Sequence, residues 1–267
     1  MRIGIIGGGF MGEAFMRGLL RAQVATPADI SVAEPVAGRR AALSEHGVRA
    51  TSDIEMACIG ADLVLLAVKP QDLPSVASSM RGALPAGCVL VSIAAGVPLD
   101  AVQRHSGHRA SVRVMPNLPA AIGEGAAVYL AAPEVSDAQR AHVRAVLDAV
   151  CTTVIEVNDD DAVDLATAIH GSGPAYVYLV MEAMIDAAVR LGMKRPDASA
   201  LVLATFVGSA RYAIETGQHV AALRNAVTSP GGTTAAALAE LEAAGVRSAF
   251  DEAIQSALLR AQELGEE

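Results

Sequence analysis

Two glycine-rich segments hold the residues with the clearest chemical meaning: RIGIIGGGFMG at 2–12 and VTSPGGTT at 227–234. Each segment leads directly into a stretch with helical character. The first N–H groups of a helix have no intrahelical partner and carry partial positive charge, so a helix start left open by glycine can bind an anion. The two segments therefore indicate two anion-binding turns, unless one of them is an ordinary capped turn.

The first segment matches the pattern GxGxxG and lies between a predicted strand and a predicted helix. Such glycines form a tight turn and let the backbone approach the pyrophosphate of a dinucleotide. The alternative is a plain tight turn between a strand and a helix. The dinucleotide hypothesis assigns cofactor binding to Gly7, Gly8, Gly9, Phe10, Met11 and Gly12.

The choice of dinucleotide depends on the end of the second predicted strand. Glu34 lies there, about 20 residues beyond Gly12, where an acidic side chain binds the ribose hydroxyls of NAD. Arg39 and Arg40 follow closely, and an arginine in this region can bind the 2′-phosphate of NADP. The arginines can equally belong to a solvated helix face. The sequence predicts NAD or NADP without choosing between them.

The second segment opens a helix predicted from Thr233 to Ala244, with Gly245 just beyond its end. A small anion such as a carboxylate fits a start of this kind, because the glycines allow close approach and hydroxyls add further hydrogen-bonding groups. The alternative is an ordinary helix capped by Thr233. The residues concerned are Ser229, Gly231, Gly232, Thr233 and Thr234.

Other polar residues near turns are weaker candidates. Lys69 follows a predicted strand, at the sheet edge where α/β proteins bind ligands, and is either a ligand contact or a solvated lysine. His170 is either a general acid or, more simply, a packed histidine. The aspartates at 159–161 indicate a solvated junction, although one of them can face a cleft. The six histidines and three cysteines have no metal-ligand spacing, so no metal is predicted.

Charge and hydropathy exclude several classes of function. The formal net charge is −9, which argues against nucleic acid or an anionic membrane as the main partner. No segment reaches the roughly 18 apolar residues of a membrane helix. Because the start resembles no secretory signal and the cysteines form no CxxC pair, three reduced thiols and a cytoplasmic location are expected.

The elements that position these turns follow from the hydrophobic pattern. Short apolar runs alternate with amphipathic helical stretches up to about residue 157, which predicts a doubly wound, mostly parallel sheet of the Rossmann type. The expected strands are 2–6, 30–34, 62–68, 88–94, 111–116, 126–131 and 152–157. The expected helices between them are 10–22, 36–46, 71–81 and 136–149.

The remainder of the chain is predicted to be helical. We therefore expect a dinucleotide-binding domain at 1–158 and an all-α dimerisation and substrate-binding domain at 159–267. The stretch 166–192 is apolar nearly all round, with Gly-Ser-Gly-Pro-Ala interrupting it near its start. Since a helix that is apolar on every face is buried on every face, a second copy of the chain is expected to cover it.

Taken together, these motifs resemble the pyrroline-5-carboxylate reductase family over nearly the whole chain. The segments that carry the resemblance are IGIIGGGFMG, LAVKPQ, VSIAAGV, VRVMPNLPAAIGEG, HGSGPAYV and VTSPGGTTAAALAELEAAGVRSAF. The resemblance implies reduction of the cyclic imine 1-pyrroline-5-carboxylate to L-proline by NAD(P)H, the last step of proline synthesis. It also implies a homodimer, often assembled further into a decamer of five dimers.

The resemblance also implies roles for individual residues. Backbone groups of the second turn would hold the substrate carboxylate, and the Thr234 hydroxyl would lie beside the ring nitrogen. Asp160 matches the acidic substrate-contacting position of the family. Hydride would then pass between two ligands, each fixed by a helix start. Further cofactor contacts carry over to Ala67, Val68, Lys69, Pro70, Ala94, Ala95 and Gly96.

Three positions depart from the pattern of the family. His170 replaces an expected serine, Asn225 stands where many relatives have aspartate, and Glu34 is acidic where NADP-preferring members have small or polar residues. Two other classes of protein fit the sequence less well. A β-hydroxyacid dehydrogenase would place a catalytic lysine on a long helix, but 166–192 contains none. A nucleotide-sensing module would leave the second turn without a role.

Overall fold

The computed structural model describes residues 1–266, which form two compact units. The first comprises Met1–Pro174 and the C-terminal segment that begins at Ala257, and the second comprises Ala175–Ser256. The strands are β1 (Ile3–Ile6), β2 (Ile30–Ala33), β3 (Arg49–Thr51), β4 (Leu63–Leu66), β5 (Val89–Ser92), β6 (Ser111–Pro116), β7 (Gly125–Ala131) and β8 (Cys151–Glu156). All of them belong to the first unit.

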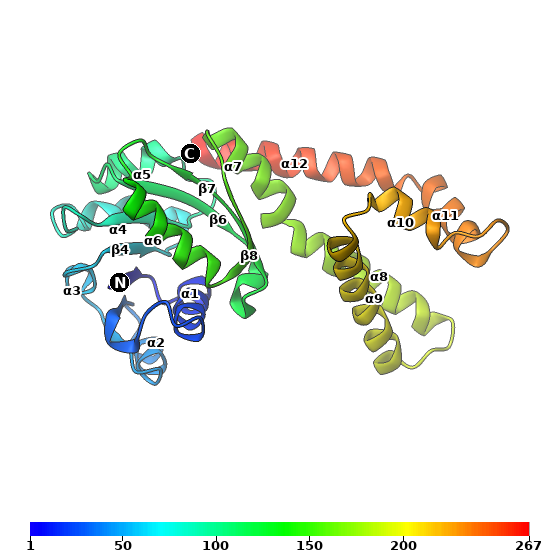
Figure 1. The fold of residues 1–267 in the computed structure, drawn as a ribbon, viewed down its shortest axis with the longest axis horizontal. Coiled ribbons are helices and arrows are strands. Elements are labelled where there is room, and N and C mark those ends of the chain that lie inside the picture. The colour runs from blue at the N-terminus through cyan, green and yellow to red at the C-terminus, as the bar shows by residue number, and fades with distance from the viewer. Residues whose placement is uncertain (267) are drawn as a thin grey trace. The chain divides into compact units, whose positions relative to one another are not determined.

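Helices of the first unit connect most of these strands along the chain and lie beside the sheet, and the last of them follows β8 (Figure 1). They are α1 (Phe10–Arg21), α2 (Ala37–Ser44), α3 (Ile54–Cys58), α4 (Leu73–Ser79), α5 (Leu99–Ser106), α6 (Asp137–Asp148) and α7 (Asp160–Ala166). Short 3₁₀ turns are η1 (Pro27–Asp29), η2 (Pro70–Asp72) and η3 (Leu118–Ile122), and η4 (Thr167–Gly171) is a π-helical turn.

The eight strands form one sheet in the order β3-β2-β1-β4-β5-β6-β7-β8. Every pair is parallel except β6 with β7. The strand order reverses direction beside β1, which pairs with β2 through Ile3 and Ile30 and with β4 through Ile3 and Leu63. Ligands bind at such a switch point, outside the carboxyl ends of the strands.

Alternate residues of the central strands enter two separate cores. Ile5 belongs to the core that includes Phe15 of α1 and Val146 of α6, whereas the next residue, Ile6, belongs to the core that includes Ala77 of α4 and Val102 of α5. This alternation buries both faces of the sheet under helices, as in doubly wound folds. The predicted fold class is confirmed.

The sequence analysis missed β3, α5 and the short helix α3. β3 has three residues, begins with the exposed Arg49 and is an edge strand of the sheet, so its apolar pattern is too short to recognise. α5 spans eight residues, of which the polar ones obscure a buried face formed by Leu99, Ala101 and Val102. The predicted strands 30–34, 62–68 and 88–94 end earlier than expected, because their last residues leave the sheet and form turns.

The second unit consists of helices. They are most of α8 (Gly173–Arg190), α9 (Arg195–Thr216), α10 (Val220–Ala226), α11 (Thr233–Ala243) and the first part of α12 (Val246–Glu266). The interruption expected inside 166–192 coincides with η4 and Ser172, after which α8 runs on with Pro174 in its first turn. Within residues 1–266, no helix combines the length and apolarity that crossing a bilayer requires.

Candidate active site

The first glycine turn joins β1 to α1 and has room only for glycine at its ends. Gly7 has a φ of +102°, and a Cβ there would lie 2.5 Å from the carbonyl oxygen of Ala67. A Cβ on Gly12 would lie 1.9 Å from the carbonyl oxygen of Gly7. The turn is therefore closed tightly against β4, which is the packing that a dinucleotide-binding turn requires.

The start of α1 is open to a ligand. Its N-cap is Gly9, and no side chain caps the helix. A Cβ placed on Gly9 would meet nothing within 4 Å, so this side of the turn faces free space. The N–H groups of Phe10, Met11 and Gly12 occupy the first helical positions, where no intrahelical acceptor is available. The turn fits a pyrophosphate group.

The other predicted cofactor residues lie at the carboxyl ends of neighbouring strands, as the first glycine turn does. Ala67 to Pro70 follow β4, and Ala94 to Gly96 follow β5, so both turns neighbour the turn after β1. Lys69 is exposed and stands at the start of η2. The fold thus brings the three predicted cofactor segments to adjacent strand ends. The contacts of these residues with a cofactor remain a prediction.

The C-terminal end of α12 packs on the turn after β5. Gly96 has a φ of +72°, and a Cβ there would lie 2.7 Å from the Cβ of Leu264. This contact lies within the first unit. The sequence alone did not indicate it, since the contact partners are 168 residues apart by their numbers and nothing in their types pairs them.

Glu34 is held inside the first glycine turn. Its side chain accepts hydrogen bonds from the backbone N–H groups of Gly8, at 3.0 Å, and Val36, at 2.9 Å. Arg39 covers the same turn from outside, because its Nε and Nη2 donate to the carbonyl oxygen of Gly8 at 3.0 and 2.8 Å. Both candidate specificity residues are thus bound to the cofactor turn itself, which sequence spacing could not reveal.

The second glycine turn precedes α11 and also leaves a helix start open. The N-cap is Gly232, without a side-chain cap, so the alternative of a Thr233 cap is wrong. Gly231 has a φ of +69°, and the N–H of Gly232 donates to the carbonyl oxygen of Ser229 at 3.0 Å. Among the residues that the structure describes, the hydroxyls of Thr233 and Thr234 have no protein partner. The turn fits a small carboxylate ligand.

Asp160 belongs to a partly buried ion cluster. Its Oδ1 accepts a hydrogen bond from the N–H of Leu99, the first residue of α5, at 3.1 Å. Arg113, on β6, donates to both Asp160 and Asp164. The side chain of Arg113 is only 3% exposed, whereas that of Asp160 is 34% exposed. The carboxylate of Asp160 therefore holds α5 and α7 to the sheet, and its role as a substrate contact stays a prediction.

Sequence reasoning missed Arg113, although a signal was present. An arginine in the middle of the apolar strand SVRVMP must find an acidic partner if it is buried. The aspartates after residue 158 were the available partners.

His170 has no free ring nitrogen. Its Nδ1 lies 2.6 Å from the carbonyl oxygen of Ala166, and its Nε2 lies 2.9 Å from that of Met115. These contacts tie η4 to β6. The packed interpretation of His170 fits this geometry better than a general acid.

The three cysteines are buried, and their thiols have low reactivity. Burial raises the pKa of the Cys58 thiol to about 11 and that of the Cys88 and Cys151 thiols to about 12. Since a thiolate is the reactive form, none of them is a nucleophile at neutral pH. Across residues 1–266, no group of three or more His, Cys, Asp or Glu side chains is arranged to hold a metal ion.

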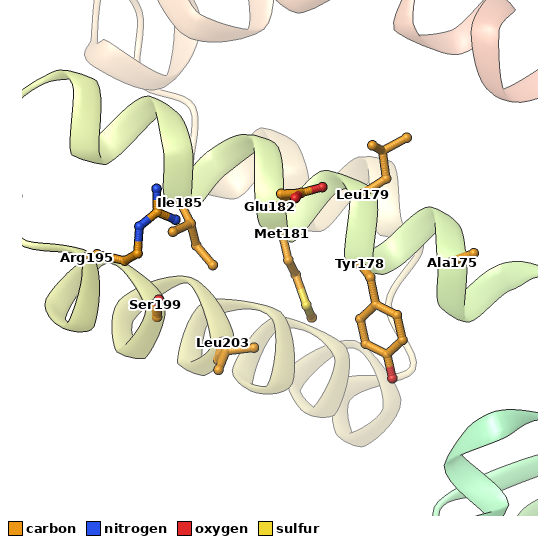
Figure 2. Close-up of a pocket in the computed structure, with 9 residues that line it drawn as sticks. All are labelled: Ala175, Tyr178, Leu179, Met181, Glu182, Ile185, Arg195, Ser199 and Leu203. Atoms are coloured by element: carbon orange, nitrogen blue, oxygen red, sulfur yellow. The ribbon is translucent and has the colours of Figure 1, made fainter. Parts of the chain in front are cut away.

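The second unit also carries an open apolar groove of about 690 Å³ between α8 and α9. Figure 2 shows Tyr178 and Met181 extending from α8 toward α9, where Leu203 lines the opposite wall. None of the predicted substrate residues lines this groove. Its lining is mostly apolar, so it suits a protein side chain or helix better than a charged substrate.

The fold and the first glycine turn together define a protein of the dinucleotide-binding class with a separate helical unit. Family models agree: one described as "NADP oxidoreductase coenzyme F420-dependent" matches residues 2–96, and one described as "Pyrroline-5-carboxylate reductase dimerisation" matches residues 160–264. A pyrroline-5-carboxylate reductase of Synechocystis sp. is 41% identical over 99% of this chain and 98% of its own.

Solved structures that are similar to this chain belong to the same family. The pyrroline-5-carboxylate reductase of Coxiella burnetii has a TM-score of 0.91 and 36% identity, with 98% of each chain covered. The Plasmodium falciparum pyrroline carboxylate reductase, solved with NADP bound, has a TM-score of 0.90 and 30% identity, with 99% of this chain and 98% of that chain covered. The chain belongs to the pyrroline-5-carboxylate reductase family.

Proposed function

We propose that this protein reduces 1-pyrroline-5-carboxylate to L-proline with NADH or NADPH, as the final step of proline biosynthesis. The observation that carries the proposal is the 41% identity to a reductase of that name over 99% of the chain. The geometry supports it, because each ligand has an open helix start of its own: α1 for the dinucleotide and α11 for the substrate carboxylate.

The chain's own residues have a limited task in this reaction. The reduced nicotinamide supplies the hydride, which adds to the imine carbon while the ring nitrogen keeps its proton and becomes an amine. The backbone of Gly231, Gly232 and Thr233 holds the carboxylate, and the Thr234 hydroxyl hydrogen-bonds at the ring nitrogen. A protonated imine is already electrophilic, so positioning by these groups supplies much of the rate.

The remaining site roles belong to the same proposal. Asp160 contacts the substrate, together with Ser229, and the segments after β1, β4 and β5 contact the dinucleotide. The match of the dimerisation model to residues 160–264 supports a domain boundary between 158 and 159 and a homodimer. A decamer of five dimers and a cytoplasmic location are part of the proposal.

The test is oxidation of NADH and, separately, NADPH by the purified protein, followed by the absorbance of the reduced nicotinamide. Turnover should depend on added 1-pyrroline-5-carboxylate and should yield proline in equal amount to the cofactor consumed. Binding of either dinucleotide without any turnover of this imine would contradict the proposed function.

A further inference from the structure

Family membership does not decide which dinucleotide this chain uses, since a relative was solved with NADP bound and the first turn fits either form. The two forms differ at one group, the 2′-position of the adenosine ribose. Glu34 stands at the end of β2, where open α/β proteins of this kind read that ribose. Glu34 and its neighbouring side chains therefore determine whether the site binds a 2′-hydroxyl or a 2′-phosphate.

The Glu34 carboxylate is fixed in place. The residue is 6% exposed, and its two oxygens each accept one backbone N–H, from Gly8 and from Val36. Turning the side chain away would leave both N–H groups without a partner, which is costly in a buried position. The negative charge therefore stays at the strand end whatever nucleotide arrives.

A fixed carboxylate discriminates between the two forms. Each oxygen retains a lone pair, so it can accept a hydrogen bond from the ribose 2′-hydroxyl. A 2′-phosphate at the same place is mostly a dianion at neutral pH, so it has almost no proton to donate and brings roughly two negative charges against the buried carboxylate. Such a like-charge contact is strongly unfavourable.

Arg39 is the side chain that could favour NADPH, by binding its 2′-phosphate. Two of its N–H groups are already bonded to the carbonyl oxygen of Gly8, and its Nη2 lies 3.7 Å from Glu13. The side chain is 45% exposed, so water screens any attraction to a phosphate. The neighbouring Arg40 donates to the carbonyl oxygens of Glu34 and Pro35. The buried carboxylate outweighs the exposed, occupied guanidinium.

We propose that Glu34 makes this chain an NADH-preferring enzyme, by binding the ribose 2′-hydroxyl and excluding the 2′-phosphate, while Arg39 braces the turn. This inference rests on the proposed function only in requiring a dinucleotide at the first turn.

The experiment is isothermal titration calorimetry of the whole protein with four probes: NADH, NADPH, adenosine 5′-monophosphate and adenosine 2′,5′-bisphosphate. The last two isolate the ribose 2′-position from the nicotinamide. We expect NADH to bind at least roughly tenfold more tightly than NADPH, and the monophosphate to bind more tightly than the bisphosphate. Equal affinities, or tighter binding of the phosphorylated member of each pair, would overturn the inference.

Variants identify the residue responsible. Glu34→Gln keeps the size of the side chain and removes its charge, so the preference for NADH should fall to less than about threefold. Glu13→Gln is the matched control, because it removes a partly exposed charge that also lies near Arg39, and the preference should persist. Arg39→Ala should weaken both dinucleotides alike. Selective loss of NADPH binding in Arg39→Ala would identify Arg39 as a phosphate contact and contradict the inference.

The titrations of the wild-type protein show whether it prefers NADH or NADPH even if Glu34→Gln does not fold. The result is also separable from the proposed function. NADH preference without turnover of the imine would overturn the function and leave the role of Glu34 intact. Turnover with a preference for NADPH would do the reverse.

Discussion

Among single residues, Thr234 is the side chain that the proposed reaction needs most. It occupies the first turn of α11, and its hydroxyl has no partner among the residues that the structure describes. We expect Thr234→Ala to lower kcat/KM at least about tenfold, the effect of losing roughly 1.4 kcal/mol of transition-state stabilisation. Steady-state kinetics with both cofactors would measure it.

The control for this variant is Thr234→Ser, which keeps the hydroxyl and should retain most of the activity. Dinucleotide affinity should be nearly unchanged in both variants, because the first turn belongs to a different part of the chain. Wild-type turnover in Thr234→Ala would remove the hydroxyl from the mechanism.

Two glycines of the first turn allow a matched comparison. Gly12→Ala places a methyl group 1.9 Å from the carbonyl oxygen of Gly7, so the turn must open. We expect a loss of about 2 kcal/mol or more in the free energy of unfolding and a loss of dinucleotide binding. Thermal unfolding and calorimetry with NADH would measure the two effects.

Gly9→Ala is the counterpart. Its φ of −66° suits alanine, and the added methyl group meets no protein atom within 4 Å. Stability should change by less than about 1 kcal/mol, while dinucleotide binding should weaken, since the methyl group enters the space left for the ligand. Unchanged binding in Gly9→Ala would show that the pyrophosphate lies elsewhere.

At the scale of elements, the cluster of Arg113, Asp160 and Asp164 joins β6, α7 and the start of α5. Asp164→Asn leaves part of a buried guanidinium charge uncompensated, and we expect a loss of about 3 kcal/mol in stability. Asp160→Asn should cost about 1 kcal/mol, because its side chain is one-third exposed and solvent screens the pair. Chemical denaturation would rank the two variants.

The same pair tests the predicted substrate contact of Asp160. If Asp160→Asn raises KM for the imine more than Asp164→Asn does, despite its smaller cost in stability, the carboxylate acts on the substrate as well. If the changes in KM of the two variants instead follow their losses in stability, Asp160 has a structural role alone.

Most elements of the first unit could be predicted from the sequence because both sheet faces are buried and helices such as α1 and α6 each have an apolar stripe that packs on the sheet. The strand ends were harder. Residues such as Ala67 and Ala94 continue the apolar pattern of their strands, yet they leave the sheet to form turns, and hydropathy alone does not register that change. β3 was missed because an edge strand of three residues contains too little hydrophobic pattern.

The candidate site was predicted better in its glycines than in its charges. Gly7 and Gly12 were recognised because their spacing reflects local steric limits that act within one turn. The hydrogen bonds of Glu34 to Gly8 and of Arg113 to Asp164 join residues far apart in sequence. Such partners depend on how distant segments are paired, and the residue pattern of one sequence indicates at most that a buried arginine needs an acidic partner, not which one.

At the scale of the whole molecule, one chain leaves much apolar surface uncovered. Helices α8 and α9 expose large side chains, among them Leu179 at 65%, Leu201 at 58% and Val207 at 51%. In residues 173–190, which form α8, none is buried by the chain itself. Soluble monomers rarely expose apolar surface on this scale, and the dimerisation model covers both helices.

We therefore expect a stable dimer through α8 and α9, with the groove between them filled by the second copy. Leu179→Glu places a charge on this surface, and desolvating it on association is costly. The variant should be monomeric at micromolar concentration by light scattering and should lose turnover, because α8 and α9 belong to the same unit as the substrate turn. Leu191→Glu is the control, since Leu191 is 89% exposed in the turn beyond α8, and it should remain dimeric and active. A monomeric wild-type protein with full activity would show that these apolar faces serve another partner.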